Sequence, residues 1–155
     1  MPKVDLAAIA ETNRTGYPPP FDDDVAGRWY RRLAPATGLS DFGASLVRLE
    51  PGAWSSQRHW HEGEDELLVM IAGEAVLVED SGETVLRPGD VAAWPAGQRD
   101  GHHLQNRSTA DVVFVVVGAG DRATDHGEYP DIDLVFDPDG YARKDGSRYP
   151  VRRIP

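Results

Sequence analysis

The sequence predicts an all-β fold, and three observations lead to that prediction. Sixteen glycines and 12 prolines divide the 155-residue chain into short runs. These runs are rich in valine, leucine and tryptophan, which favour strands over helices. Successive runs between residues 42 and 118 have the spacing that is typical of an antiparallel sandwich or barrel.

The expected strands are bounded by residues that favour turns. Asp80, Ser81 and Gly82 separate two alternating runs, where the glycine can adopt a positive φ. ProGlyAsp at 88–90 and ProAlaGly at 95–97 bracket a further run. The expected strands, in order, are Phe42–Glu50, Ser55–His61, Leu67–Ile71, Ala75–Glu79, Thr84–Arg87, Val91–Trp94, His102–Asn106 and Val112–Gly118.

The chain length indicates one domain with a sizeable core. Residues 1–33 contain one short apolar run, Leu6–Ala10, so we expect an extended N-terminal arm there. We assign residues 34–120 to a β-barrel domain. Residues 121–155 are polar and rich in turn signals, and they predict an extended tail that packs on the barrel or on a partner subunit. Disorder is the alternative for this tail.

Composition excludes several classes of function. Lysine and arginine number 16 against 26 acidic residues, and the net charge of −10 argues against nucleic acid as a partner. The chain has no cysteine, so histidine and carboxylate are its strong metal ligands. The longest apolar run, Val112–Val117, is strand-sized, so no membrane association is expected. The N-terminus has no secretory pattern, which favours a cytoplasmic location.

The run HWHEGEDE at 59–66 is the strongest sign of chemistry in the sequence. Side chains alternate along a strand, so His59 and His61 share one face and Trp60 lies on the other. Glu66 follows a polar turn and could lie opposite the two histidines on the next strand. With His102, this set offers three imidazoles and a carboxylate to a divalent ion. The alternative is a polar turn with hydrogen-bonded or surface histidines.

These residues carry a resemblance to the two motifs of the cupin superfamily. The first motif, G(X)5HXH(X)3,4E(X)6G, is matched by Gly52, His59, His61, Glu66 and Gly73, with one extra residue after Gly52. The second motif, G(X)5PXG(X)2H(X)3N, is matched by Gly89, Pro95, Gly97, His102 and Asn106, with two extra residues before His102. Both departures are changes in loop length.

The resemblance implies a cupin-type double-stranded β-helix, a jelly-roll barrel that is usually a homodimer. It also implies that His59, His61, Glu66 and His102 bind one divalent metal ion, with Fe, Mn, Ni and Zn all open. The stretches SSQRHWHEGEDE and PAGQRDGHHLQN resemble a bacterial group of single-domain conserved-barrel cupins that is functionally uncharacterised.

Other polar residues near the motifs have competing interpretations. His103 is an alternative to His102, but Asn106 fits the motif only if His102 is the ligand. His126 is expected at the surface. Solvated turn positions are expected for Glu62, Glu64 and Asp65. Trp60 and Trp94 could line a pocket or pack within the sheets. A carboxylate substrate could be bound by Arg48, Arg58 or Arg99, of which Arg58 is the weakest because it lies on the face opposite the histidines.

Such a site suits a small, oxygen-rich molecule. We expect a metal-dependent enzyme that acts on a small carbonyl, carboxylate or enol substrate, with dioxygenase-like chemistry slightly favoured over isomerase or lyase chemistry. No individual catalytic residue is assigned. The alternative is a non-catalytic binding or sensor protein in which the metal is structural, because one fold serves many functions.

Overall fold

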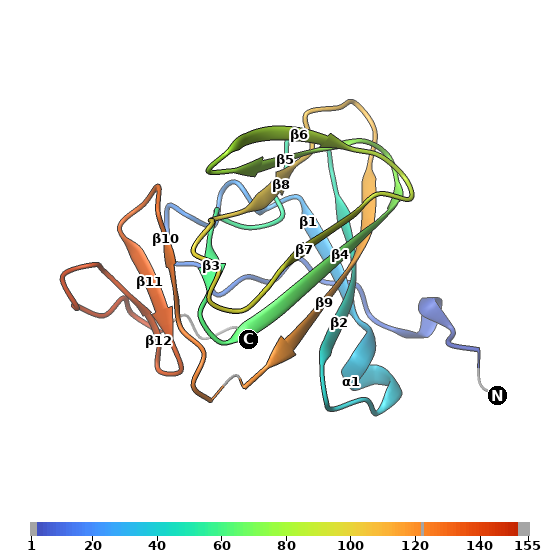
Figure 1. Cartoon of the computed structure of the whole chain (residues 1–155). Helices are drawn as coiled ribbons and strands as arrows, with labels where there is room; N and C mark the ends of the chain where they lie inside the picture. Colours follow the sequence, from blue (N-terminus) through green and yellow to red (C-terminus); the bar gives the residue numbers. More distant parts are fainter. Residues whose placement is uncertain (1–2, 122, 152–155) are drawn as a thin grey trace.

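The computed structural model describes residues 3–121 and 123–151 and consists almost entirely of antiparallel strands (Figure 1). The largest sheet has the order β1-β2-β9-β4-β7, formed by Arg28–Arg32, Gly43–Leu49, Val112–Gly120, Glu64–Ala72 and Val91–Trp94. A three-stranded sheet has the order β6-β5-β8, formed by Gly82–Leu86, Ala75–Glu79 and His103–Gln105. The third sheet has the order β12-β11-β10-β3, formed by Gly140–Ala142, Leu134–Asp137, Gly127–Tyr129 and Trp60–His61. The short helices are η1 (Leu6–Ala8) and α1 (Leu33–Thr37). The predicted all-β fold is confirmed.

The strand boundaries differ from the expected ones near the histidine pair. The expected strand Ser55–His61 is reduced to β3, preceded by isolated bridges at Trp54 and His59. Gln57, between these bridges, donates a side-chain hydrogen bond to the Phe21 carbonyl. The turn after His61 is also shorter than predicted, because β4 already begins at Glu64.

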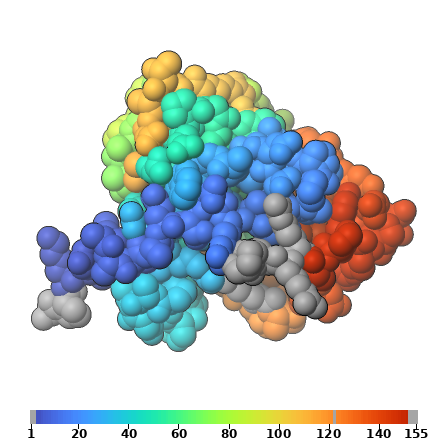
Figure 2. Space-filling model, turned by 180° about the vertical axis from the view of Figure 1, so that it is seen from behind, coloured from blue at the N-terminus to red at the C-terminus, as the bar shows by residue number. Residues whose placement is uncertain are grey.

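Both terminal segments contain strands that complete the architecture. β1 lies within the expected arm and pairs along its full length with β2. β10, in the expected tail, pairs with β3 and therefore lies directly beside His61. In Figure 2 the blue N-terminal residues run across the molecule toward the red C-terminal ones. Tyr17 and Val25 from the first segment form a second buried cluster with Tyr129 and Leu134 from the last.

The main core lies between the five-stranded and three-stranded sheets. On β4, Leu68 and Met70 are buried, whereas Leu67 and Ile71 on the opposite face are 40% and 51% exposed. This alternation buries one face of the sheet and leaves the other apolar and accessible. No helix among the described residues is long and apolar enough to cross a membrane.

Candidate metal centre and cavity

Backbone pairing brings the two histidine motifs together although about forty residues separate them. His59 and His102 form an antiparallel bridge, in which the His102 N–H donates to the His59 carbonyl at 2.9 Å. Glu66 lies on β4 and pairs with Trp94 on one side and Gly118 on the other. The inner face of β4 thus presents the carboxylate toward the histidine bridge.

The four predicted ligands form one side-chain cluster. Donor atoms of His59, His61 and Glu66 all lie within 4.8 Å of one another. Glu66 Oε2 is 2.7 Å from His102 Nε2 and 3.9 Å from His61 Nε2. His102 therefore joins the cluster through Glu66. The fold brings the four side chains together, and their role as metal ligands stays a prediction.

The hydrogen bonds of the three imidazoles fit a metal site. Each Nδ1 has an oxygen within hydrogen-bond distance, which for His59 and His61 favours the tautomer in which Nδ1–H donates and Nε2 keeps its lone pair. The acceptors are Gln57 O for His59 at 2.9 Å, Asp100 O for His102 at 3.1 Å and Asp125 Oδ2 for His61 at 2.6 Å. The Nε2 atoms of His59 and His61 are thereby available as ligands, whereas Nε2 of His102 lies 2.7 Å from Glu66 Oε2 and would exchange this hydrogen bond for the metal.

The protonation states of the cluster also suit a cation. Burial, reinforced by neighbouring His61 and His102, lowers the pKa of His59 to about 3 despite the carboxylate nearby. Burial would raise the pKa of Glu66, but its hydrogen bond to His102 and the adjacent imidazoles lower that pKa to about 2. Near neutral pH the site thus contains a neutral His59 and an ionised Glu66, the forms that bind metal.

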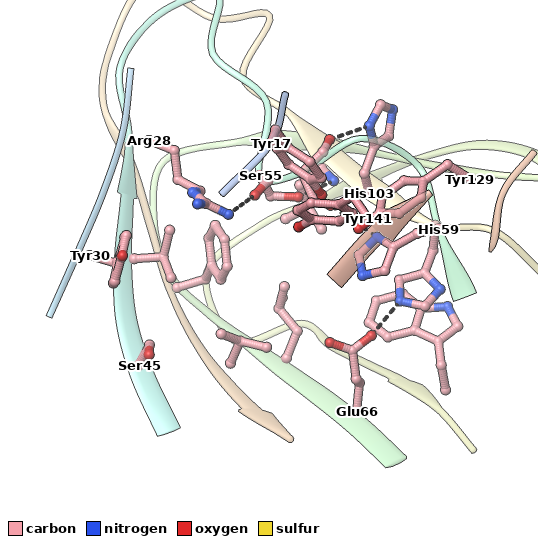
Figure 3. A pocket seen from close by; sticks show the side chains of 18 residues that line it. Tyr17, Arg28, Tyr30, Ser45, Ser55, His59, Glu66, His103, Tyr129 and Tyr141 are labelled. Atoms are coloured by element: carbon pink, nitrogen blue, oxygen red, sulfur yellow. Dashed lines mark hydrogen bonds and ion pairs between the residues drawn. The ribbon is translucent and has the colours of Figure 1, made fainter. Parts of the chain in front are cut away.

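A cavity of 360 Å³ opens beside the cluster (Figure 3). Its volume falls within the roughly 300–1,000 Å³ typical of small-molecule sites. His59, Glu66 and His102 form one part of the wall. The other lining residues are Tyr17, Arg28, Tyr30, Ser45, Val47, Ser55, Ser56, Leu68, Trp94, His103, Leu104, Phe114, Val116, Tyr129 and Tyr141. The N-terminal segment, the barrel and the C-terminal segment all contribute to this wall.

Comparison with known proteins identifies the family. The family model for the cupin domain matches residues 45–118. The crystal structure of a cupin described as a sugar phosphate isomerase, from Silicibacter pomeroyi DSS-3, is 44% identical, covers 96% of this chain and 97% of its own, and superposes with a TM-score of 0.89. The chain belongs to the cupin superfamily.

Two further relatives of this cupin are more distant. A structure described as a proposed sugar phosphate isomerase, from Acidithiobacillus ferrooxidans ATCC 23270, is 26% identical, covers 82% of this chain and 81% of its own, and has a TM-score of 0.70. An oxalate-binding protein of Thermotoga maritima is 31% identical over 71 residues, which span 46% of this chain and 56% of that protein.

The aromatic and histidine neighbours of the cupin site take distinct positions. Trp94 stacks on His102 with ring centroids 3.9 Å apart and lines the cavity. Trp60 is buried outside the cavity wall, beneath the Arg99 guanidinium. The nitrogens of His103 are within hydrogen-bond distance of the Ser56 carbonyl and of the Gln105 amide, so His103 is held by the fold and lies apart from the carboxylate of Glu66.

The acidic residues after His61 do not all occupy a turn. Glu62 lies in the turn and pairs with Arg99. Glu64 and Asp65 belong to β4, and Asp65 accepts a hydrogen bond from the Ala96 N–H. The prediction of a turn for Glu64 and Asp65 was wrong because pairing with β9 extends β4 toward the histidines.

The three arginines considered for substrate binding do not line the cavity. Arg48 forms ion pairs with Glu11, Glu50 and Asp111 on the outer face of the sheet. Arg58 pairs with Asp80 and Asp131. Arg99 pairs with Glu62 at the surface. The arginine that reaches the cavity is Arg28, whose only sequence signal was the alternating run RWYRR within the expected arm.

Proposed function

We propose that this cupin is a metal-dependent isomerase of a small hydroxy-carbonyl compound of the sugar phosphate class. The observation that carries the proposal is the cluster of His59, His61, Glu66 and His102, of which His59, Glu66 and His102 line a cavity of small-molecule size. The likeness to a described sugar phosphate isomerase over 96% of the chain supports the reaction class.

The four clustered residues would hold one divalent ion of Fe, Mn, Ni or Zn. Four protein ligands leave two positions of an octahedron for oxygen atoms of a substrate. When bound, the ion would supply the Lewis acidity that stabilises negative charge developing on a carbonyl oxygen. The surrounding apolar wall, including Leu68, Phe114 and Val116, would exclude water and strengthen electrostatic contacts with the substrate.

The metal site has a direct test. We expect protein purified without added metal, then incubated with one of the four ions and desalted, to retain about one ion per chain. The variants His59→Ala and His102→Ala should lose most of it, because each removes a ligand. His126→Ala is the matched control, since His126 is exposed and outside the cluster. Equal metal content in all four proteins would show that the ion binds elsewhere.

The reaction class is tested separately by turnover. Metal-free protein reloaded with each ion is mixed with a panel of aldose and ketose phosphates, and the sugar protons are followed by NMR. Interconversion without oxygen uptake is the expected result. Oxygen uptake with an oxidised product would favour the dioxygenase-like alternative, and saturable binding without turnover would favour a sensor.

A further inference from the structure

Arg28 is the charged residue of the cavity that the metal cluster does not use. Its strand partner across β1 and β2 is Leu49, and Tyr30 pairs with Val47. Leu49 and Val47 are buried in the core, so Arg28 and Tyr30 face the interior on the same side. Figure 3 shows the Arg28 side chain reaching inward on the side of the cavity opposite Glu66.

The guanidinium of Arg28 has a hydrogen-bond donor without a partner among the described residues. Its Nη1 donates to the Ser55 carbonyl at 2.9 Å. Its Nε is buried and has no hydrogen-bond partner among the described residues. Within the same described part of the chain, Arg28 has no ion pair with a carboxylate, unlike Arg48, Arg58 and Arg107. Buried donors of a charged group are normally satisfied, so an unpaired one beside a cavity indicates a missing acceptor.

The polarity of the cavity indicates which acceptor is missing. Of the described residues that line it, Arg28 is the one permanent cation and Glu66 the one carboxylate. A divalent ion at the cluster would more than offset the charge of Glu66 and leave the cavity positive inside a chain of net charge −10. The ring of Tyr30 lies 5.3 Å from the guanidinium carbon and holds it by a cation–π contact.

We propose that Arg28 binds the phosphate group of the substrate while the carbonyl end lies at the histidine–glutamate cluster. This inference rests on the proposed function, because it names the second anchor point of the same site. Arginine presents paired N–H donors that match two phosphate oxygens, and the Nε of Arg28 is a buried donor without a partner among the described residues. Arg28 would therefore select phosphorylated over neutral sugars and orient them.

Binding of inorganic phosphate to metal-free protein tests Arg28 without any turnover. Wild type should bind phosphate, measured by calorimetry, and Arg28→Gln should weaken binding by about 10- to 100-fold through loss of charged hydrogen bonds. Arg28→Lys keeps the charge but not the paired donors, so an intermediate loss is expected. Arg99→Gln is the control, because Arg99 is 68% exposed and outside the cavity. Circular dichroism checks that each variant is folded, and if Arg28→Gln is not, Arg28→Lys alone decides.

Each outcome bears on one proposal at a time. The assignment would be overturned if Arg28→Gln and Arg28→Lys left the phosphate affinity unchanged. It would also be overturned if only Arg99→Gln reduced that affinity. Acetate bound as tightly as phosphate through Arg28 would overturn it in favour of a carboxylate substrate. With an active enzyme, Arg28→Gln should raise KM for the phosphorylated sugar more than it lowers kcat. If phosphate binds through Arg28 but no sugar phosphate turns over, the proposed reaction fails and the anion site stands.

Discussion

Asp125 links the C-terminal segment to the histidine–glutamate cluster through one buried carboxylate. Its Oδ2 accepts a hydrogen bond from His61 Nδ1 at 2.6 Å, and its Oδ1 accepts one from the Gly63 N–H at 2.8 Å. The carboxylate holds the His61 ring in the orientation that directs Nε2 toward Glu66. A carboxylate behind an imidazole fixes the tautomer and ring orientation that a metal ligand needs.

We therefore predict that Asp125→Asn weakens metal binding by about 10- to 100-fold. The amide can still accept from Gly63, so the turn should persist while the charge behind His61 is lost. Affinity is measured by competition with a chromophoric chelator. Asp139→Asn is the control, because the Asp139 side chain is 89% exposed. Unchanged affinity in Asp125→Asn would mean that His61 needs no orienting carboxylate.

The clustered histidines and glutamate were predictable from sequence, whereas Asp125 and Arg28 were not. Period-two alternation puts His59 and His61 on one face wherever the strand lies. Asp125 meets His61 only because β10 pairs with β3, and Arg28 reaches the cavity only because β1 pairs with β2. Such pairings join distant segments, and no local pattern in the sequence specifies them.

The pairing of β10 with β3 is the contact between elements that supports the site. Gly127 lies opposite His61 in this pair. A Cβ at position 127 would overlap the Trp60 carbonyl oxygen and the Phe136 ring, so only glycine allows the strands this close approach.

Gly127→Ala should accordingly destabilise the fold by about 1–3 kcal/mol, the usual cost of overpacking a tight contact. It should also weaken metal binding, because displacement of β10 from β3 would move the preceding Asp125 away from His61. Chemical denaturation and the chelator assay measure the two effects. In the control Gly16→Ala, the added Cβ would meet Tyr141 at an ordinary 3.5 Å. A Gly127→Ala protein as stable as wild type would show that β10 can shift freely.

Two buried tyrosines, Tyr17 and Tyr129, and the partly buried Tyr141 join the N-terminal segment to the strands of the C-terminal segment. Tyr17 lies 5.6 Å from Tyr129 and 5.5 Å from Tyr141 between ring centroids. Burial raises the pKa of all three phenols, and the positive charge of Arg28 opposes this only in part at Tyr17 and Tyr141. The cluster is therefore stable in its neutral form.

This cluster predicts a loss of stability at high pH. Burial raises the pKa of these phenols in the folded state above the unfolded value of about 10. Just above pH 10, such a phenol therefore keeps its proton in the folded state and loses it in the unfolded state. Its contribution is complete below pH 10 and is lost as the pH rises above that value. On titration to high pH, the phenolate absorbance of Tyr17, Tyr129 and Tyr141 should appear together with loss of the circular dichroism signal. Tyr141→Phe should reduce the size of this absorbance change. Complete ionisation of the protein's five tyrosines in a folded chain would contradict this.

The elements themselves were predicted unevenly, for a physical reason. Ala75–Glu79 and Val91–Trp94 match β5 and β7, since each combines apolar residues with a clear turn at its ends. β1 and β10 were not predicted as strands, because RWYRR and GEY have few aliphatic residues. Their strand structure comes from pairing with β2 and β3 and from the shared tyrosine cluster.

At the scale of the whole molecule, the outer face of β4, β7 and β9 in the five-stranded sheet is apolar on an otherwise acidic protein. Val91 on β7 is 58% exposed and Leu67 on β4 is 40% exposed. They lie on the same face as Val69, Val115 and Val117, which are partly exposed. A contiguous apolar surface on a sheet of this kind is typical of a subunit interface.

We predict that two copies associate through this face to form a homodimer. An interface of standard size buries about 1,600 Å² in total, and a charge introduced within it is left desolvated and unpaired. Val91→Asp should therefore give a monomer in sedimentation velocity at concentrations where wild type is dimeric. Val85→Asp is the control, because Val85 is similarly accessible at 40% but lies on β6 in another sheet.

The net charge of −10 per chain opposes association, so dimer affinity should rise with salt. A wild type that sediments as a monomer at every protein and salt concentration would contradict the prediction, and a Val85→Asp monomer would place the interface on the other sheet.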